Sequence, residues 1–359
     1  MNKLLTSLLL ITLFFTLTTQ TIFADQTATL LPFSDGFYSQ WDPKTGTSHF
    51  AMVDETSCNG TTDFNKTTII GERDSYGISL SSIPNGATIT QIAITPCASK
   101  ALSGGVNSTM NIFYRFNGSN SADAGNYSLT GTTPVLLSAT SFGSLATVKG
   151  ASSTLEIGAL LSGGAKGVRL SQISTMLTYT PLFAPSSLTT ATGSSLLNIN
   201  LGWTDNATTE DGFRIERNGI EIASTAANVI TYNDATGLIE GNQYTYRVRA
   251  SNSGGFSNYS NTSTIRLPLL TPTNLTAATG SSQLDVDLAW TDNSTKESFY
   301  NIERNDGLGW VKIASASANA TSYNDNNGLV SGQQYNYRVK AISGSNFSAY
   351  SNTATVLLP

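Results

Sequence analysis

The side chains of this sequence that could do chemistry gather early in the chain. Asp54 and Glu55 are adjacent, Glu72 and Asp74 follow, and His49 is the only histidine. A pair of facing carboxylates can hydrolyse a glycosidic bond, and a histidine can act as a general base. Asp54 and Glu55 cannot form such a pair on a strand, because adjacent strand residues point to opposite faces. Asp54 could pair with Asp74 or Glu72, but no Gly-x-Ser-x-Gly elbow or other nucleophile motif accompanies them.

Oxygen atoms of these acids could also bind a calcium ion. Asp42, Asp54, Asp63 and Asp74 supply carboxylates in the N-terminal region, and calcium takes oxygen ligands. Their spacing matches no calcium-binding loop, so a position in solvated loops is the alternative. We therefore keep calcium as an option for residues 25–182 and expect no other cofactor.

Aromatic rings are the second kind of candidate, because a sugar ring can stack on an exposed aromatic side chain. Trp41, together with Phe37 and Tyr38, could form such a platform, and packing of the first strand into the core is the alternative. Trp310 could stack on a sugar in the same way, or it could pack its hairpin onto the sheet. The predicted ligand-contacting residues are therefore Trp41, Asp54, Asp74 and Trp310.

Residues 25–182 must position most of these side chains, and their pattern is that of an all-β domain. Met110, Ile112, Tyr114 and Phe116 fall at every second position, and this period of two indicates a strand with one buried face. Other predicted strands are His49–Val53, Ile78–Leu80, Thr88–Thr95 and Ile173–Tyr179, and 84–86 is a predicted turn. About eight or more strands in one domain predict a jelly roll or a similar two-sheet sandwich.

The second half of the chain contains an internal repeat. Leu201–Asn206 returns as Leu288–Asn293, and Trp203 and Trp290 stand 87 residues apart. Other matched segments are Arg214–Arg217 with Asn301–Arg304, Tyr232–Asp234 with Tyr323–Asp325, Tyr244–Ala250 with Tyr335–Ala341, and Ser257–Asn261 with Ser348–Asn352. A period of this length indicates two small domains rather than a solenoid.

Each repeat has the pattern of a β-sandwich. Tyr244, Tyr246, Val248 and Ala250 share one predicted face of a strand. Asn-Gly at 218–219 and Asn-Asp-Gly at 305–307 are predicted hairpin turns. About seven short strands separated by such turns indicate a sandwich of two antiparallel sheets.

At these residues the repeats, 183–268 and 269–359, resemble the fibronectin type III family. Trp203 and Trp290 match the buried tryptophan of the second strand. Tyr244 and Tyr335, each six residues after a leucine, match the tyrosine corner, whose hydroxyl bonds back to the chain upstream. The resemblance implies core positions for these four residues. The segment 36–96 resembles a sandwich domain found beside fibronectin type III modules in secreted and surface proteins, and no catalytic residue carries over from it.

The N-terminus and the cysteines indicate export. One lysine, a hydrophobic run over Leu4–Leu17 and a small residue before Asp25 predict a cleaved signal peptide, 1–24. The run is short for a membrane span, and an uncleaved anchor is the alternative. Cys58 and Cys97 are the only cysteines, and in an exported protein they predict a disulfide. A metal pair, the alternative, lacks further ligands.

Composition limits the partners. Only 12% of the residues are charged, the net charge is −5 and the pI is about 4.9, so no nucleic-acid partner is expected. We expect no membrane span after signal cleavage and no wall-sorting signal. The expected location is extracellular or at the cell surface.

Three functions compete. The first is a secreted, non-enzymatic binding or adhesion protein, whose N-terminal sandwich recognises an extracellular polysaccharide or surface protein while stiff, proline-marked linkers space the domains. The second is a structural subunit of a surface layer or filament. The third is a secreted carbohydrate-active hydrolase, which no motif supports.

Overall fold

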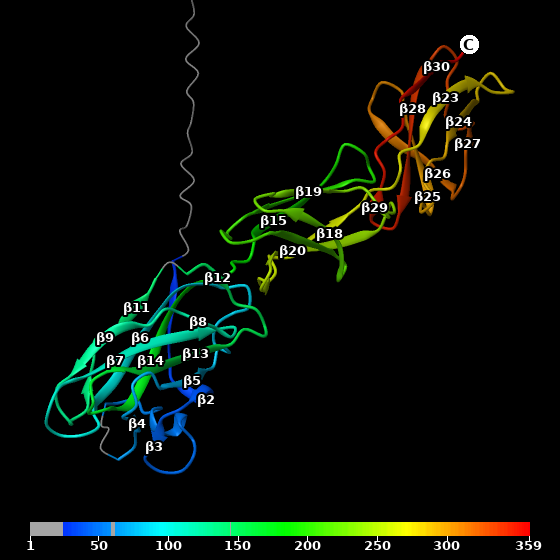
Figure 1. Ribbon diagram of the computed structural model, residues 1–359. Coiled ribbons are helices and arrows are strands. Elements are labelled where there is room, and N and C mark those ends of the chain that lie inside the picture. Colours follow the sequence, from blue (N-terminus) through cyan, green and yellow to red (C-terminus); the bar gives the residue numbers. More distant parts are fainter. Residues whose placement is uncertain (1–23, 59–61, 144) are drawn as a thin grey trace, which may run out of the picture.

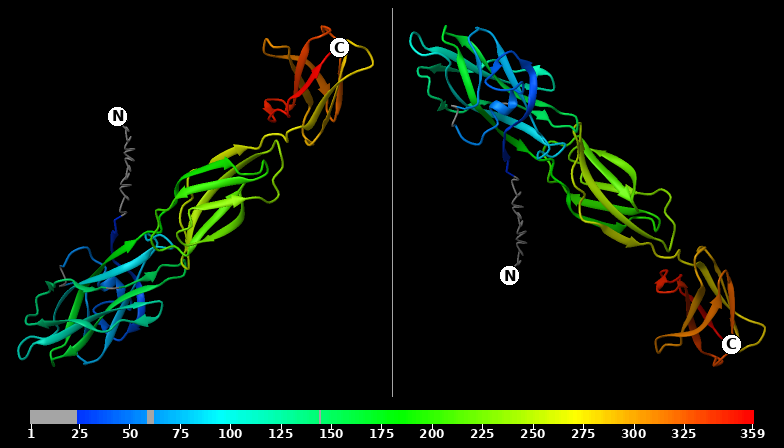
Figure 2. Two further views of the ribbon diagram at one scale, coloured as in Figure 1. Left: turned by 90° about the horizontal axis from the view of Figure 1, so that it is seen from above. Right: turned by 90° about the horizontal axis from the view of Figure 1, so that it is seen from below.

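The computed structural model describes residues 24–58, 62–143 and 145–359. The predicted signal peptide lies outside these ranges except for Ala24. Three β-sandwiches follow one another along an extended molecule (Figures 1 and 2). We call them the N-terminal domain (25–182), the first fibronectin domain (183–268) and the second fibronectin domain (269–359). No helix within the described ranges has the length and hydropathy needed to cross a membrane.

The N-terminal domain consists of two antiparallel sheets. Sheet A has the order β10 (Val135–Leu136), β6 (Thr88–Lys100), β14 (Val168–Thr180), β4 (Asn65–Thr67), β3 (Asp42–Pro43); β1 (Gln26–Leu30) also pairs with β14, and β11 (Thr140–Phe142) and β12 (Thr147–Val148) pair with β6. Sheet B has the order β2 (Pro32–Ser39), β5 (Arg73–Ile78), β13 (Leu155–Gly163), β7 (Ser108–Phe116), β8 (Ser119–Asn120), and β9 (Ala124–Leu129) pairs with β7.

This connectivity is that of a jelly roll. From β4 onward the chain passes between the two sheets: β5 lies in sheet B, β6 in sheet A, β7 and β9 in B, β10 to β12 in A, β13 in B and β14 in A. The last two strands therefore insert beside earlier ones, β14 next to β6 and β13 between β5 and β7. Such interleaving produces the two Greek keys of a jelly roll, and the predicted all-β fold is confirmed.

Two predicted strands of this domain are wrong in whole or in part. β5 ends at Ile78, so Ser79 and Leu80 of the predicted strand Ile78–Leu80 lie outside it. Residues 49–53 contain a 3-10 helix, η1 (Phe50–Met52), in which Met52 N–H and Val53 N–H donate to the carbonyls of His49 and Phe50 at 3.2 and 3.0 Å. Both the His49 and Val53 side chains are buried. Tertiary burial of these two residues overrides the strand propensity of the segment.

The repeats have the fibronectin type III fold. In the first fibronectin domain a three-stranded sheet, β15 (Ser186–Thr192), β16 (Ile199–Thr204), β19 (Thr231–Asp234), packs on a sheet of β18 (Ile220–Ala226), β17 (Gly212–Arg217), β20 (Gln243–Asn252), β21 (Gly255–Phe256) and β22 (Ser263–Arg266). The second repeats this order with β23 (Thr273–Thr279), β24 (Val286–Thr291), β27 (Ser322–Asp325), then β26 (Trp310–Ser317), β25 (Phe299–Asn305), β28 (Gln334–Ser343), β29 (Asn346–Phe347) and β30 (Ala354–Leu357).

The residues predicted to form the cores of the repeats do so. Trp203 and Trp290 are 5% exposed, and Tyr244 and Tyr335 are 6% and 2% exposed. The two tyrosine hydroxyls accept hydrogen bonds from upstream backbone groups, Ile239 N–H at 2.8 Å and Val330 N–H at 2.9 Å. Each bond satisfies a backbone donor that would otherwise be lost at the corner between the sheets.

Direct contacts join consecutive domains. At the first junction, the Asn252 amide donates to the Gly86 carbonyl at 2.9 Å, and Gly254 lies so close to Lys149 that an added Cβ would be 2.6 Å from its carbonyl oxygen. At the second, the buried Glu240 carboxylate accepts bonds from Leu270 N–H and Thr295 N–H, both at 2.6 Å. At both junctions, therefore, hydrogen bonds between the domains add to the covalent linker.

Candidate functional site

The structure brings two of the predicted chemical residues together. Asp74 of β5 is fully buried, and both its carboxylate oxygens lie 2.9 Å from His49 Nδ1. The Tyr76 hydroxyl donates to the same carboxylate at 2.9 Å, and the Asn65 amide donates to that hydroxyl at 3.0 Å and to the His49 carbonyl at 2.7 Å. This network fixes the start of η1 to sheet B from inside the sandwich.

Burial changes the pKa of the Asp74 carboxyl group. It raises the pKa of Asp74 to about 7, although the bond to His49 opposes the rise. A catalytic pair must reach its substrate, whereas Asp74 is 0% and His49 8% exposed. The pair therefore serves to hold the η1 segment in place, and its geometry gives no support to a hydrolase.

The other predicted residues are separated from it. Trp41 is 2% exposed and its indole N–H donates to the Glu72 carbonyl at 3.0 Å, so it is a core residue with no face for a ligand. Asp54 is exposed in the turn after η1, so it does not face the buried Asp74. Trp310 lies in another domain, partly buried, with the Arg338 guanidinium 4.2 Å from its ring centre. Trp310 thus packs against a side chain of the sheet, which is the alternative to stacking on a sugar.

The four candidate calcium ligands do not meet at one point, although Asp54 and Asp63 both lie near Glu55. Asp42 is exposed on β3, Asp54 is exposed in a turn and Asp74 is buried with His49. Burial raises the pKa of Glu55 to about 7, and the neighbouring Asp63 and Asp54 carboxyls contribute to the rise. Within the described ranges no group of three or more His, Cys, Asp or Glu residues is arranged to hold a metal ion.

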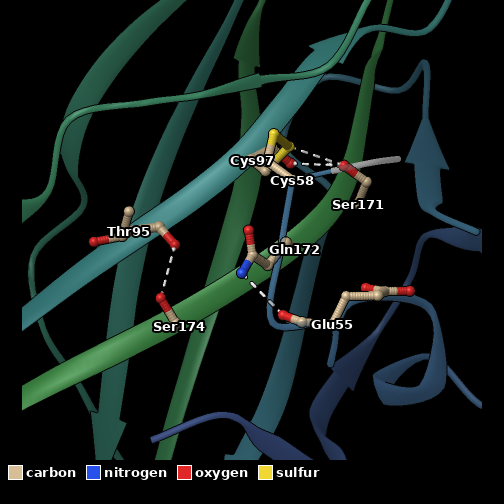
Figure 3. The surroundings of a disulfide bond; sticks show 7 residues. All are labelled: Glu55, Cys58, Thr95, Cys97, Ser171, Gln172 and Ser174. Atoms are coloured by element: carbon tan, nitrogen blue, oxygen red, sulfur yellow. Dashed lines mark hydrogen bonds between the residues drawn. A yellow bond between two sulfur atoms is a disulfide. The ribbon is translucent and has the colours of Figure 1, made fainter. Parts of the chain in front are cut away.

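The predicted disulfide is present. Cys58, beyond η1, is bonded to Cys97 of β6, with a Cα–Cα distance of 5.6 Å (Figure 3). Next to it, the Gln172 amide donates to the Glu55 carbonyl at 2.9 Å and the Ser171 hydroxyl lies 3.2 Å from Cys97 Sγ. The disulfide thus attaches the η1 segment to sheet A, while the His49–Asp74 pair attaches it to sheet B.

A groove on sheet B has the size and lining to hold a small ligand. Its volume is about 430 Å³, and it is lined by Phe33–Gly36 of β2, by Gly77–Ser81 at the end of β5 and beyond it, by Lys149 and Ala151, and by Ser153–Glu156 at the start of β13. We call it the aromatic groove, because the Phe33 ring, 57% exposed, forms one wall. Gly77 gives the floor no side chain, and serine and threonine hydroxyls line the other wall. An open apolar ring beside several hydroxyls is suited to a small polar ligand.

An irregularity of β2 creates this surface. The register with β5 shifts between Asp35 and Ser39, so residues 36–38 pass over the outer face of sheet B. Phe37 N–H donates to the Glu156 carboxylate at 2.8 Å, and the Arg115 guanidinium lies 3.9 Å from the Phe37 ring centre. The strand therefore bulges between Asp35 and Ser39, where its pairing with β5 resumes, and the bulge carries the exposed Phe37 ring across the sheet, as bulges near binding surfaces commonly do.

Sequence reasoning missed most of the aromatic groove. Of its residues, none was predicted to contact a ligand, although the neighbouring Phe37 and Tyr38 were considered beside Trp41. The signal lay in the short run Pro32–Ser39, where two phenylalanines fall four residues apart. In a regular strand those positions share a face, and both rings are in fact exposed at 57% and 65%.

Of three comparisons with known proteins, only the one with solved structures gives matches. No family model matches the sequence, and no curated protein matches it. Similar solved structures include a two-domain fibronectin type III segment of chicken tenascin (16% identity, TM-score 0.40, 48% of this chain and 98% of that one). Another is an Fn3-like protein from Clostridium thermocellum (29% identity, TM-score 0.23, 26% of this chain and 95% of that one). A third comprises the chicken CNTN1 FN1–FN3 domains (18% identity, TM-score 0.25, 77% of this chain and 98% of that one). The fold assignment itself depends on the strand order given above.

Proposed function

We propose that this protein is a secreted, non-enzymatic binding protein. Its N-terminal domain recognises a carbohydrate of an extracellular or cell-surface polymer in the aromatic groove, and the fibronectin domains act as spacers in adhesion. The observation that carries the proposal is the exposed Phe33 ring beside the hydroxyl-lined wall of the groove. A sugar presents the matching combination, an apolar ring face and a rim of hydroxyls.

The rest of the molecule supports this reading. The disulfide is typical of proteins that fold in an oxidising compartment. The domain junctions hold the three sandwiches in an extended row (Figure 2), which would keep a recognition domain away from whatever surface carries the protein. The buried state of Asp74 and His49 keeps these two side chains from reaching a ligand in the groove.

The test is retention of the full-length protein on a panel of insoluble neutral polysaccharides. Phe33→Ala should reduce retention by about 10-fold or more, because a buried aromatic contact contributes more than about 1.4 kcal/mol to binding. Phe33→Trp, which keeps an aromatic ring, should retain binding. Phe256→Ala is the control, since that ring is also exposed, at 46%, but lies in the first fibronectin domain. Equal losses for Phe33→Ala and Phe256→Ala, or no retention of the wild type on any polymer, would contradict the proposal.

A further inference from the structure

The two fibronectin domains present the same sheet face with different charges. On this face the first domain carries Arg247 and Arg249 on β20, and the second carries Arg338 and Lys340 at the matching positions of β28. In both, the cations alternate with aromatic rings: Arg247 lies 3.7 Å from the Tyr259 ring centre, and Arg338 lies 3.7 Å from that of Tyr350. The stacking holds the cationic side chains flat along the sheet.

In the first fibronectin domain acids neutralise this face. Arg247 pairs with Glu216 at 2.7 Å. Glu221 of β18 pairs with Arg214 at 3.1 Å and with Arg249 at 3.9 Å. Each of the three arginines therefore has a carboxylate partner within the sheet, and little positive charge is left for an external ligand.

In the second fibronectin domain one of these acids is replaced by a lysine. Lys312 of β26 occupies the position of Glu221, as its pairing with Glu303 matches that of Glu221 with Glu216. Arg338 keeps its pair with Glu303 at 2.7 Å. Lys312 and Lys340 form no ion pair with any described residue, and their ammonium groups lie over the Phe299 and Phe347 rings at 5.6 and 5.3 Å.

Trp310 adds an aromatic ring to the same surface. It is absent from the first repeat, where the two-residue turn Asn218-Gly219 connects the strands. It pairs with Asn305 at the start of β26, two residues before Lys312, and its partly buried ring packs on Arg338. We call Trp310, Lys312, Arg338 and Lys340 the basic face.

We propose that the basic face binds an anionic polysaccharide, one that carries carboxylate or sulfate groups. Two unpaired ammonium groups held by aromatic stacking complement repeated anionic charges, and an indole ring beside them suits the sugar ring between those charges. The face stands out because the domain as a whole, like the protein, has excess acidic residues. This second contact is independent of the aromatic groove, and it gives the last domain a role beyond spacing.

The experiment is affinity electrophoresis of the full-length protein through gels containing polygalacturonate or dextran sulfate, with neutral dextran and polyglutamate as further arms. The wild type should be retarded by at least one of the two anionic polysaccharides, and added salt should weaken the effect. The polysaccharide that retards more strongly identifies the carboxylate or the sulfate as the preferred group. No retardation by either would overturn the proposal, and so would polyglutamate binding that is as tight.

Matched variants locate the interaction. Lys312→Gln/Lys340→Gln should weaken binding by about 10-fold, equivalent to about 1.4 kcal/mol. Lys66→Gln/Lys166→Gln makes the same change of net charge in the N-terminal domain and should leave binding within about 2-fold of the wild type. Glu221→Lys gives the first fibronectin domain the missing cation and should strengthen binding. Equal effects of the two double glutamine variants would show a non-specific charge effect and overturn the assignment. Phe33→Ala should bind these polyanions normally, which separates this inference from the proposed function.

Discussion

Buried carboxyl groups make the N-terminal domain sensitive to pH. Asp74 lies inside the sandwich with His49, Tyr76 and Asn65 as its neighbours. Burial raises the pKa of Asp74 from 3.8 to about 7 and that of Glu55 from 4.5 to about 7. At a pH between about 4 and about 7, these two carboxyl groups are protonated in the folded state and ionised in the unfolded state. Stability therefore decreases as the pH rises from about 4 to about 7.

We expect the thermal midpoint of the N-terminal domain to be at least about 3 °C lower at pH 8 than at pH 5. Asp74→Asn, which stays uncharged, should lose the part of this slope that Asp74 contributes. Differential scanning calorimetry of the full-length protein measures both, and the transition that shifts in Asp74→Asn belongs to the N-terminal domain. A midpoint that rises from pH 5 to pH 8, or an identical slope in the variant, would contradict the assignment.

In the fibronectin domains, the pKa values of Glu216 and Glu303, which pair with Arg247 and Arg338, shift in the opposite direction. The bond from Arg247 is the main cause that lowers the pKa of Glu216. The pKa of Glu303 is also lowered, because the bonds from Tyr350 and Arg338 outweigh its partial burial. Their contribution to stability is present at neutral pH and is lost in acid, as the pH falls through the lowered values. These two carboxyl groups thus change stability with pH in the direction opposite to that of Asp74 and Glu55.

At the scale of elements, the segment around η1 is held by two attachments. Its His49 end bonds to β5 of sheet B, and Cys58 at its other end is bonded to β6 of sheet A. The disulfide closes a loop with a sequence separation of 39. By restricting the unfolded chain, such a loop adds about 3–4 kcal/mol to the free energy of unfolding.

Reduction of the disulfide should therefore lower the urea midpoint of the N-terminal domain and leave the fibronectin domains unchanged. The double variant Cys58→Ala/Cys97→Ala should unfold like the reduced protein and should not respond to reductant. Urea titrations with and without dithiothreitol, followed by hydrogen exchange of β6 and β20, measure each domain separately. The same midpoint for oxidised and reduced protein would show that the disulfide does not stabilise the fold.

How far the sequence predicts these elements depends on how local their causes are. The strands of the repeats follow from alternation along Tyr244–Ala250 and its copy, and their turns from Asn-Gly at 218–219, where both residues adopt positive φ. These signals act over a few residues. The 3-10 helix at Phe50–Met52 was missed because its cause, burial of His49 against Asp74, lies 25 residues away in the sequence.

The candidate site shows the same limit. Cys58 and Cys97 could be paired from their number and the expected compartment alone. Trp41 and Trp310 have the right residue type for a sugar platform, but only the tertiary structure shows that Trp41 is in the core. The aromatic groove lies beside the register shifts of β2 over sheet B. Such shifts cannot be read from residue types.

At the scale of the whole molecule, Glu240 determines how the fibronectin domains are joined. Besides the two backbone donors, the hydroxyls of Ser294 and Thr295 donate to its carboxylate at 2.9 and 3.1 Å. The Asn346 amide of β29 donates to the Leu267 carbonyl at 3.1 Å from the other side. A buried carboxylate with this many donors is costly to remove, because the donors then lack a partner.

Glu240→Ala should therefore loosen the junction without unfolding either domain. We expect NMR relaxation measurements to give one rotational correlation time for the two fibronectin domains of the wild type and separate times for those of Glu240→Ala. The junction should lose about 1–3 kcal/mol, the usual cost of leaving buried donors unpaired. Glu221→Ala, on the face of the first fibronectin domain, is the control and should leave tumbling unchanged. Relaxation rates that remain equal in Glu240→Ala would show that other contacts hold the row together.

The central claim is that the aromatic groove of the N-terminal domain binds a carbohydrate. Its most direct test is a hydrogen-exchange footprint of the full-length protein with and without a soluble oligosaccharide of the polymer that retains it. We expect slower exchange in Phe33–Gly36 and Ser153–Glu156, which line the groove, and no such protection in Phe33→Ala. Protection confined to other segments, or the same footprint in Phe33→Ala, would contradict it.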